Sequence, residues 1–510
     1  MIYLAWARPH LRFSIHMITP SKKNFLELVK NGRIPPLSEE IPYLSPSSLY
    51  ESLASPNSFL LESMKGPMKI ARYSFIGLDP YAVFRVKNGL IEIESLGKTT
   101  AVSGKPLNIL KELVSSYKQV PSEHLPPFQG GAVGVLSYDF VQYLEKLPTV
   151  AVDDLNLPDA HFLMVDKLIA FDHQEQKCWV IVCPGARDTG KNQMDWIEKY
   201  DEVEYRIQRA KRSIEQRAKS SKTSLKPQSP WPVHKVEINY EMRKNDYMHI
   251  VRRAKEYIAA GDIFQANLSQ RVSSHIGTID RWSIYKKLSS INPAPFAVFL
   301  DFGDYQVVGS SPERLLRVND GIVETRPIAG TRPRGRDWRE DDFMRAELLL
   351  NEKERAEHIM LVDLERNDLG RVSDYGTVRV DELMITEDCS HVIHIVSNVR
   401  GRLANRKDCF DAIGAAFPGG TITGVPKIRC MEIIEELEPV KRGPYTGSIG
   451  YISFSGNMDL NIIIRTFVVK GERAYVQVGA GIVADSDPER EYYETLKKAE
   501  ALLKTLERVQ

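Results

Sequence analysis

Hydrophobic residues recur at helical spacing in two segments that lie far apart in the chain. In residues 348–372, LLLNEKERAEHIMLVDLERNDLGRV, the apolar side chains of Ala356, Ile359 and Leu364 repeat with the period of a helix face. This spacing predicts an amphipathic helix that begins near Asn351. The segment DPEREYYETLKKAEALL, residues 487–503, predicts a second helix with a similar arrangement of acidic residues.

Other segments read as strands joined by short turns. YAVFRVKNGLIEIE (residues 81–94) contains a KNG turn, and FAVFLDFGDYQVVGSS (residues 296–311) predicts a hairpin around Gly303 and Asp304. Residues 247–272 predict a helix stopped by Gly261 and followed by a strand, and residues 447–486 predict three strands separated by turns. Because neither βαβ alternation nor a short repeat appears, the predicted class is α+β, with antiparallel sheets in both halves.

The chain divides into two regions at a polar stretch that is rich in Ser, Lys and Pro. Residues 218–235, AKSSKTSLKPQSPWPVHK, are predicted to be a linker between an N-terminal region, 17–217, and a C-terminal region, 236–510. The basic helix predicted just before the linker is read as a solvated helix face. The apolar run at the start of the sequence is too short for a membrane span, and no signal-peptide pattern follows it. Met17 as the true initiator is an open alternative.

Composition narrows the classes of protein to consider. The 510 residues are 43% hydrophobic and 26% charged, which is typical of a soluble globular protein. A net charge of +1 indicates neither a nucleic acid nor a membrane surface as a partner. The 5 cysteines are scattered and none forms a C-x-x-C motif. We therefore expect a cytoplasmic protein without a disulfide framework.

Both predicted helices carry two glutamates three residues apart, on one helix face, where like charges repel. The pairs are Glu354 with Glu357, and Glu491 with Glu494. Solvated surface residues partnered by neighbouring basic side chains are the simpler explanation of one such pair. The arrangement recurs, however, both helices adjoin glycine-rich strand ends, and no Cys/His set indicates zinc. Hard carboxylate ligands from two helices indicate Mg²⁺, which would also bind an anionic substrate.

Several groups in the C-terminal region could hold an anion. The Gly330–Thr331 turn offers backbone N–H groups and a hydroxyl, residues 479–481 (Gly-Ala-Gly) allow close approach to the backbone, and Arg465 ends an apolar stretch read as a strand. No P-loop motif is present, and each feature alone is weak. Together with the glutamate pairs they indicate a site for a small dianion with a metal. His394, in a predicted apolar strand with His391, is expected to point inward.

These segments together resemble the chorismate-utilising enzymes, a family that includes component I of anthranilate synthase and of aminodeoxychorismate synthase, and the isochorismate and salicylate synthases. The strongest matches are PIAGTRPRG (327–335), AEHIMLVDLERNDLGRV (356–372), GPYTGSIGY (443–451), IIIRT (462–466) and GAGIVADSDPEREYYETLKKA (479–499). The resemblance implies large antiparallel sheets packed as a sandwich with helices outside, and chorismate as the substrate.

The resemblance also assigns roles to residues. It implies Glu357 and Glu494 as direct Mg²⁺ ligands, with Glu354 and Glu491 as water-mediated neighbours. It implies that Glu313 is the acid that helps the ring hydroxyl leave and that His394, Thr421 and Lys498 lie in the active site. The implied chorismate contacts are Gly330, Thr331, Tyr445, Arg465, Gly479, Ala480 and Gly481. It further implies a separate glutamine amidotransferase subunit that supplies ammonia.

The resemblance leaves two products to distinguish, anthranilate and aminodeoxychorismate. Many aminodeoxychorismate synthases carry a lysine at the position of Ala329, where it attacks C2 of the ring, so alanine favours ammonia attack and anthranilate plus pyruvate. The motifs FPGGTITG and MDLNI resemble the aminodeoxychorismate branch instead, and that product is the alternative. A water-using isochorismate or salicylate synthase and a non-catalytic amidotransferase-binding subunit are further alternatives. A tryptophan-binding regulatory pocket is implied at Leu61, Glu62, Ser63, Asn292, Pro293 and Ala294.

Overall fold

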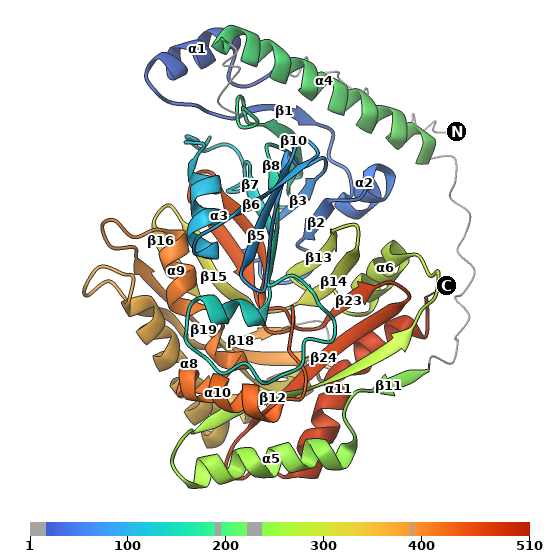
Figure 1. Ribbon diagram of the computed structural model, residues 1–510, viewed down its shortest axis with the longest axis vertical. Coiled ribbons are helices and arrows are strands. Elements are labelled where there is room, and N and C mark those ends of the chain that lie inside the picture. The colour runs from blue at the N-terminus through green and yellow to red at the C-terminus, as the bar shows by residue number, and fades with distance from the viewer. Residues whose placement is uncertain (1–16, 189–194, 222–236, 389–391, 510) are drawn as a thin grey trace, which may run out of the picture.

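The computed structural model describes residues 17–188, 195–221, 237–388 and 392–509. Two large sheets dominate it, and their named strands pair antiparallel (Figure 1). The first sheet runs in the order β1 (Leu37–Ile41), β10 (Lys177–Val182), β9 (Lys167–Asp172), β3 (Tyr73–Gly77), β2 (Ser58–Glu62), β13 (Phe296–Asp301), β14 (Tyr305–Ser311), β23 (Thr466–Lys470), β24 (Arg473–Ile482), β12 (Gln265–His275) and β11 (Ile238–Tyr240), with β20 (Gly424–Val425) on β12. The predicted α+β class with antiparallel sheets is confirmed.

The second sheet is built in the same way. Its order is β17 (Ile328–Pro333), β19 (Val392–Arg402), β16 (Ile322–Thr325), β15 (Arg314–Asn319), β22 (Met458–Asn461), β21 (Ser448–Ser453), β7 (Gly131–Leu136), β8 (Ala160–Val165), β4 (Ala82–Lys87), β5 (Leu90–Ser95) and β6 (Lys98–Val102), with β18 (Arg379–Asp388) on β19. Both sheets contain strands from 17–217 and from 236–510. The first residues of the predicted linker, 218–221, belong to the end of helix α4. From residue 222 the predicted linker lies outside the described residues.

The two sheets pack face to face, with helices outside. Phe59 and Phe75 of the first sheet share a buried cluster with Val133 and Leu163 of the second. Leu60, which follows Phe59, points to the opposite face and belongs to a cluster covered by helices. Strands buried on both faces explain why the sequence contains apolar runs such as CWVIVC rather than strict alternation.

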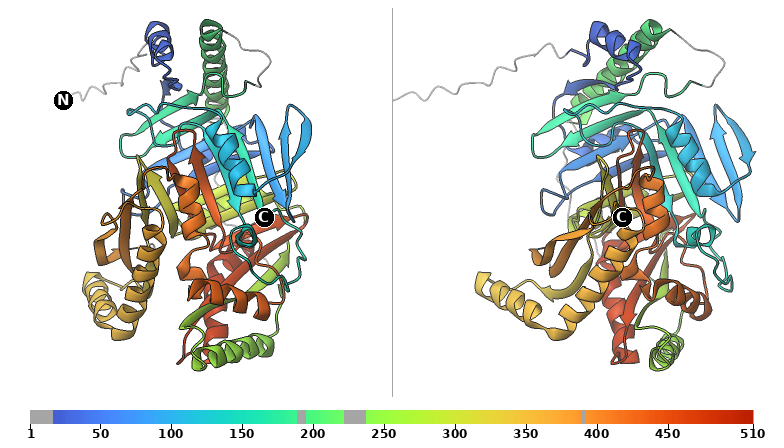
Figure 2. Two further views of the ribbon diagram at one scale, coloured as in Figure 1. Left: turned by 60° about the vertical axis from the view of Figure 1, so that its left-hand side comes forward. Right: turned by 90° about the vertical axis from the view of Figure 1, so that its left-hand side faces the viewer.

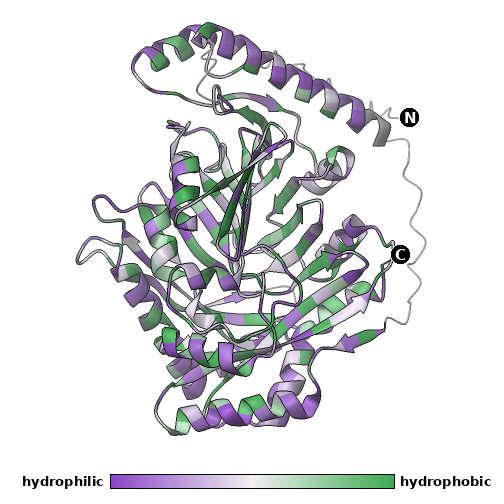
Figure 3. Ribbon diagram, in the orientation of Figure 1, coloured by the Kyte–Doolittle hydropathy of each residue, from purple (hydrophilic) through white to green (hydrophobic). Residues whose placement is uncertain are grey.

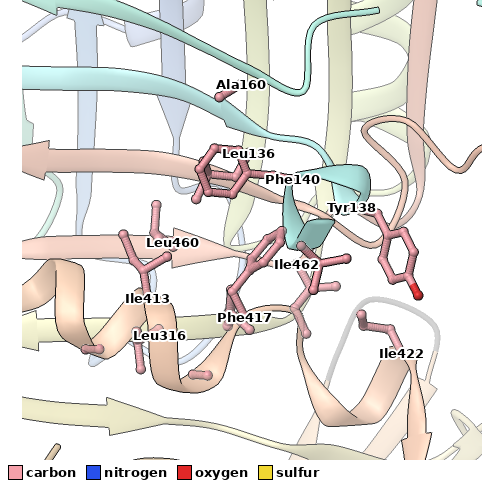
Figure 4. Packing of buried hydrophobic residues seen from close by; sticks show 14 of the residues in the cluster. Leu136, Tyr138, Phe140, Ala160, Leu316, Ile413, Phe417, Ile422, Leu460 and Ile462 are labelled. Atoms are coloured by element: carbon pink, nitrogen blue, oxygen red, sulfur yellow. The ribbon is translucent and has the colours of Figure 1, made fainter. Parts of the chain in front are cut away.

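Helices cover the outer faces. α1 (Lys22–Lys30), α2 (Pro46–Leu53), α4 (Trp196–Ser221), α6 (Arg281–Ile291) and α11 (Pro488–Leu506) contribute to the core of the first sheet. α3 (Pro106–Ser115), α5 (Lys244–Ala259), α8 (Glu352–Gly370), α9 (Cys409–Ala416) and α10 (Lys427–Leu437) contribute to the other large core, and two short 3-10 helices are η1 (Tyr138–Tyr143) and η2 (Gly420–Ile422). In Figure 4, Ile413 of α9 and the adjoining Phe417 lie over Leu316 and Leu460 of the second sheet.

Helix α4 shows how a charged helix is retained on this surface. It is predominantly hydrophilic in Figure 3, and its buried residues Tyr200, Val203, Ile207 and Ile214 recur at helical spacing. The predicted solvated face is thus confirmed for its described side chains.

Among the helices of the described ranges, none has both the length and the apolar content needed to cross a membrane. Cys178, Cys183, Cys409 and Cys430 are buried free thiols.

Candidate active site

The two glutamate pairs lie at the N-terminal ends of two helices. α8 begins after Asn351, whose side-chain oxygen accepts the N–H of Glu354 at 3.0 Å, and α11 begins after Asp487, which accepts the N–H of Arg490 at 2.9 Å. The predicted helix start near Asn351 is confirmed. The partial positive charge of a helix N-terminus offsets part of the repulsion within each pair. Together with α7 (Trp338–Leu350), α8 projects from the lower part of the molecule in both views of Figure 2.

Lysine side chains connect the two helix ends. Lys353 of α8 pairs with Asp485, just before α11, at 2.7 Å, and it interacts electrostatically with both Glu357 and Glu491. Lys498 of α11 pairs with Glu494 at 2.8 Å and also acts on Glu357. The acidic residues of the two distant segments therefore belong to one charged cluster.

Two of these carboxylates are placed where a cation would stabilise them. Burial, followed by the charge of Glu354, raises the pKa of Glu357, although a hydrogen bond of 2.9 Å from Gln265 opposes the shift. Burial and the charge of Glu494 raise the pKa of Glu491. Carboxylate oxygens are the ligands that a hard divalent cation prefers, and such a cation can complete its coordination with water. In the described part of the chain, however, no three His, Cys, Asp or Glu side chains form a metal-binding arrangement.

The Gly330–Thr331 turn lies directly beside this cluster. The register of β17 on β19 shifts between Ala329 and Thr331, and Gly330 has a φ of +67°. A bulge glycine of this kind adopts the left-handed region without strain. A Cβ atom at Gly330 would also lie 3.0 Å from a carboxylate oxygen of Glu354. The turn and the first glutamate pair are therefore packed together.

His394 lies on β19 opposite Thr331 and is buried, as predicted. Its Nδ1 lies 3.0 Å from Thr331 Oγ1 and 3.3 Å from the carbonyl oxygen of Gly330. A carbonyl only accepts, so the contact with Gly330 favours the tautomer in which Nδ1 carries the proton and Nε2 has a lone pair. Nε2 is buried without a hydrogen-bond partner among the described residues. His391 lies outside them.

Glu313, the predicted catalytic acid, is buried, with 6% of its surface exposed. The Thr421 hydroxyl donates to it at 2.9 Å, and the N–H of Ile328 and the charge of Arg465 also stabilise its anion. Burial outweighs these effects and raises the pKa of Glu313 to about 7. A carboxyl group with this pKa can donate a proton near neutral pH.

Arg465 lies in a crossing between the sheets and not at the end of a strand, so that part of the sequence interpretation is wrong. Residues 462–464 lie outside the strands, between β22 of the second sheet and β23 of the first, and Arg465 has a φ of +52°. The chain turns here as it passes from one sheet to the other. The arginine lies close enough to lower the pKa of both Glu313 and His394.

Gly479 and Gly481 lie inside strand β24, where neighbouring polar side chains occupy the space that a larger residue would need. A Cβ atom at Gly479 would lie 2.5 Å from Asn267 Oδ1 and 2.8 Å from the hydroxyl of Tyr445, and one at Gly481 would lie 2.6 Å from Gln265 Nε2. Lys498 donates to the carbonyl of Gly479 at 3.0 Å. These contacts join the glycine segment to the charged cluster.

A cavity of about 610 Å³ lies between the sheets, away from these groups. Leu61, Glu62 and Ser63 line it, together with Pro295 and Tyr451 among others. The predicted regulatory residues Asn292, Pro293 and Ala294 do not line it, but Ala294 accepts the N–H of Met64 at 3.2 Å. Of the three, Ala294 is thereby joined to the residue directly after Ser63.

Comparison with known proteins identifies the family. A sequence profile described as chorismate binding enzyme matches residues 56–504. The chain belongs to the chorismate binding enzyme family. It is 45% identical over 496 residues to anthranilate synthase component 1 of Acetivibrio thermocellus, covering 96% of this chain and 99% of the relative. It is 42% identical over 476 residues to aminodeoxychorismate synthase component 1 of Bacillus subtilis (strain 168), covering 92% and 97%.

A solved structure of the same family agrees with this fold. Anthranilate synthase component I from Streptococcus pneumoniae TIGR4 matches with a TM-score of 0.73 and 35% sequence identity, covering 90% of this chain and 97% of that chain. The resemblance to the chorismate-utilising family and the predicted sandwich of antiparallel sheets are thereby confirmed.

Sequence reasoning missed several residues of this chorismate binding enzyme that surround the predicted site. Gln265 and Asn267 lie on β12, next to the glycine segment of β24, and Lys353 connects the two acidic helices. Gln265 and Asn267 belong to the segment FQANLSQRV, in which amide side chains at alternate positions are typical of the polar face of a strand and do not by themselves indicate a site. Only the pairing of β12 with β24 places them at the site.

We predict that His394 remains neutral throughout the physiological pH range. Burial, followed by the charge of Arg465, lowers its pKa to about 4, so the ring gains its second proton only below that pH. The measurement is an NMR pH titration of histidine labelled with ¹³C in the ring, with the His394 signal assigned by its loss in His394→Gln. A midpoint at or above about 6, the range of an ordinary histidine, would contradict the prediction.

Proposed function

We propose that the chain is component I of an anthranilate synthase, which converts chorismate and ammonia to anthranilate, pyruvate and water. The observation that carries this proposal is the buried carboxyl group of Glu313, whose pKa of about 7 allows it to be a proton donor. Ammonia would form a bond to C2 as both ring double bonds shift, to C1=C6 and C4=C5, and the C4–oxygen bond breaks. The departing hydroxyl would take the proton of Glu313 and leave as water.

The second half of the reaction requires a base. Loss of the proton at C2, with departure of the enolpyruvyl side chain as pyruvate, makes the ring aromatic. His394 suits the proton transfer, because it is neutral and its Nε2 lone pair is free among the described residues. Thr331 and the Gly330 carbonyl hold the ring of His394 in the tautomer that exposes this lone pair.

The charged groups suit a substrate with two carboxylates. Arg465, the Gly330–Thr331 turn, Tyr445 and the Gly479–Gly481 segment would bind and orient chorismate. Glu357 and Glu494 would hold Mg²⁺ directly, with Glu354 and Glu491 through water. When bound, the ion would neutralise repulsion between these glutamates and the ring carboxylate and withdraw electron density from the ring. Lys498 would balance the remaining negative charge, since it already contacts Glu494 and Gly479.

The side chain directly before the Gly330–Thr331 turn favours anthranilate over aminodeoxychorismate as the product. Ala329, directly before Gly330, has no nucleophilic group that could attack C2 in place of ammonia. A separate glutamine amidotransferase would supply the ammonia, in the cytoplasm. Two relatives are named component 1 of their synthases, which supports the proposal that a second subunit takes part.

The cavity between the sheets is proposed as a regulatory site for tryptophan. Leu61, Phe75 and Tyr451 offer an apolar wall, and Arg314 and Asp459 offer charged groups in the same cavity. Such a combination suits an amino acid with an aromatic side chain.

The direct test is product analysis with ammonia alone. Purified protein given chorismate, Mg²⁺ and ammonium salt near pH 8.5 should form fluorescent anthranilate and an equal amount of pyruvate. If neither forms, but adding aminodeoxychorismate lyase yields p-aminobenzoate, the alternative product is correct. Product formed without any nitrogen source would indicate a water-using synthase, and no conversion at all would indicate a non-catalytic subunit.

Replacing Glu357 with glutamine should remove a metal ligand while preserving the side-chain volume. We expect turnover at ordinary Mg²⁺ to fall by about 100-fold or more, and calorimetric titration to show weaker Mg²⁺ binding in the presence of chorismate. Glu352→Gln, an exposed residue in the first turn of the same helix, is the matched control and should resemble the unchanged protein. Normal Mg²⁺ affinity in Glu357→Gln would rule out this ligand assignment.

Ser63 should influence inhibition by tryptophan. Its hydroxyl donates to the carbonyl of Pro295 at 3.1 Å and thereby joins two parts of the cavity wall. Loss of about one hydrogen bond in Ser63→Ala should raise the tryptophan concentration for half inhibition roughly tenfold. Turnover without tryptophan is measured in parallel, with the exposed Ser116→Ala as control. Unchanged inhibition in Ser63→Ala would disprove the role of this side chain.

A further inference from the structure

Arg442, which follows helix α10, forms a buried ion pair with Glu438. Each residue is 3% exposed. The Nε and Nη2 groups of Arg442 donate to the two carboxylate oxygens of Glu438 at 2.9 and 2.7 Å. The N–H of Ser269, on β12, donates to the same carboxylate at 2.7 Å. Two buried charges with this geometry satisfy each other, so the pair can be retained inside the protein.

The other N–H groups of Arg442 connect three segments of the chain. Nη1 donates to the carbonyl of Ile422 at 3.0 Å and to the hydroxyl of Thr446 at 3.2 Å. Nη2 also donates to the carbonyl of Asn267, on β12, at 2.6 Å. Every N–H group of the guanidinium therefore has an acceptor. The 3-10 helix η2, which ends at Ile422, is thereby tied to β12 and to the segment after α10.

The Ile422 carbonyl lies next to a contact of the proposed acid. Thr421, the preceding residue, donates its hydroxyl to the carboxylate of Glu313 at 2.9 Å. The carbonyl of Thr423, the following residue, accepts the N–H of Asn267 at 2.9 Å. The turn that carries Thr421 is therefore held both by β12 and by the buried guanidinium.

Lysine could not reproduce the contacts of Arg442. An arginine presents its donors in a fixed planar fork, whereas a lysine ammonium has fewer donors, all on one nitrogen. Arg442→Lys would thus keep a positive charge beside Glu438 but could not hold the acceptors on β12 and η2 at the same time. This substitution separates the geometry of the side chain from its charge.

We propose that Arg442 is a positioning residue that holds the Thr421 hydroxyl against Glu313 by fixing the carbonyl of Ile422. Its role in the reaction rests on the proposed function, in which Glu313 donates a proton. Arg442 itself does not touch the substrate. Its effect on turnover passes through the hydrogen bond between Thr421 and Glu313.

A double-mutant cycle with Arg442→Lys and Thr421→Val tests whether the two residues act in series. Each single variant should lower kcat about tenfold, because Glu313 loses the same hydrogen bond in both. The KM for chorismate should change by less than about threefold. The double variant should also lose about tenfold if the residues act in series, whereas independent effects would multiply to about 100-fold.

A second measurement needs no turnover. A pH titration of protein labelled with [5-¹³C]glutamate gives the pKa of Glu313, with its carboxyl signal assigned by its loss in Glu313→Gln. The hydrogen bond from Thr421 stabilises the anion of Glu313, so Thr421→Val should raise this pKa by about half a unit or more. The same rise is expected in Arg442→Lys, with no further rise in the double variant.

Arg271→Lys is the matched control. Arg271 is also 3% exposed and pairs with a carboxylate, that of Asp154, which lies between η1 and β8 and not in η2. This variant should leave both kcat and the pKa of Glu313 unchanged.

If Arg442→Lys does not fold, Arg442→Met combined with Glu438→Gln removes both buried charges and still leaves Ile422 without its donor. This pair of substitutions should raise the pKa of Glu313 equally. A 100-fold loss in the double variant of the cycle, a raised KM with unchanged kcat, or an unmoved pKa of Glu313 would overturn the proposal. Absence of amination activity in the unchanged protein would instead overturn the proposed function, and the titration of Glu313 would still decide the role of Arg442.

Discussion

Two of the links at which the chain crosses from one sheet to the other lie side by side, and the arrangement of the site depends on the hydrogen bonds between them. Glu313 lies in the link from β14 to β15, and Arg465 in the link from β22 to β23. The N–H of Ile462 donates to the carbonyl of Glu313 at 3.0 Å, and the N–H of Ser310 donates to the carbonyl of Arg465 at 3.2 Å. An acid and a cation that are 152 positions apart in sequence are thereby held together. Polar backbone in a buried crossing must be paired, so these bonds are a requirement of the fold as well as of the site.

The same crossing separates two electrostatic environments. Glu313 and Glu365 lie where burial dominates, and both keep a proton near neutral pH. The glutamate pairs lie near the N-terminal ends of α8 and α11, where Lys353 and Lys498 supply positive charge, although burial raises the pKa of Glu357 and of Glu491 as well. Identical side chains are thus placed in different surroundings, which suits them to the different roles proposed for them.

Local sequence patterns were sufficient for the parts of the structure that local interactions decide. The start of α8 at Asn351, the end of α5 before Gly261 and the hairpin at Gly303 are set by capping and turn residues, and all were predicted. The strand expected through Ile462–Ile464 was not formed, because a change of sheet overrides the preference of isoleucine for strands. Which strands neighbour one another could not be predicted from periodicity, and Gln265 and Asn267 were missed for that reason.

Glu365 illustrates the limit most clearly. In the segment LERND it stands between charged and polar neighbours, and an exposed position on an amphipathic helix is what its sequence context indicates. It is buried because η2 and the end of β16 close over that side of α8, and Lys427, whose charge acts on it, is paired with Asp368. Burial, followed by the charge of Asp368, raises the pKa of Glu365 to about 8. Glu313 likewise depends on its surroundings, since burial raises its pKa while Thr421, the N–H of Ile328 and the charge of Arg465 lower it. The chemical character of Glu313 is therefore a property of contacts made by three separate parts of the chain, and no single motif contains it.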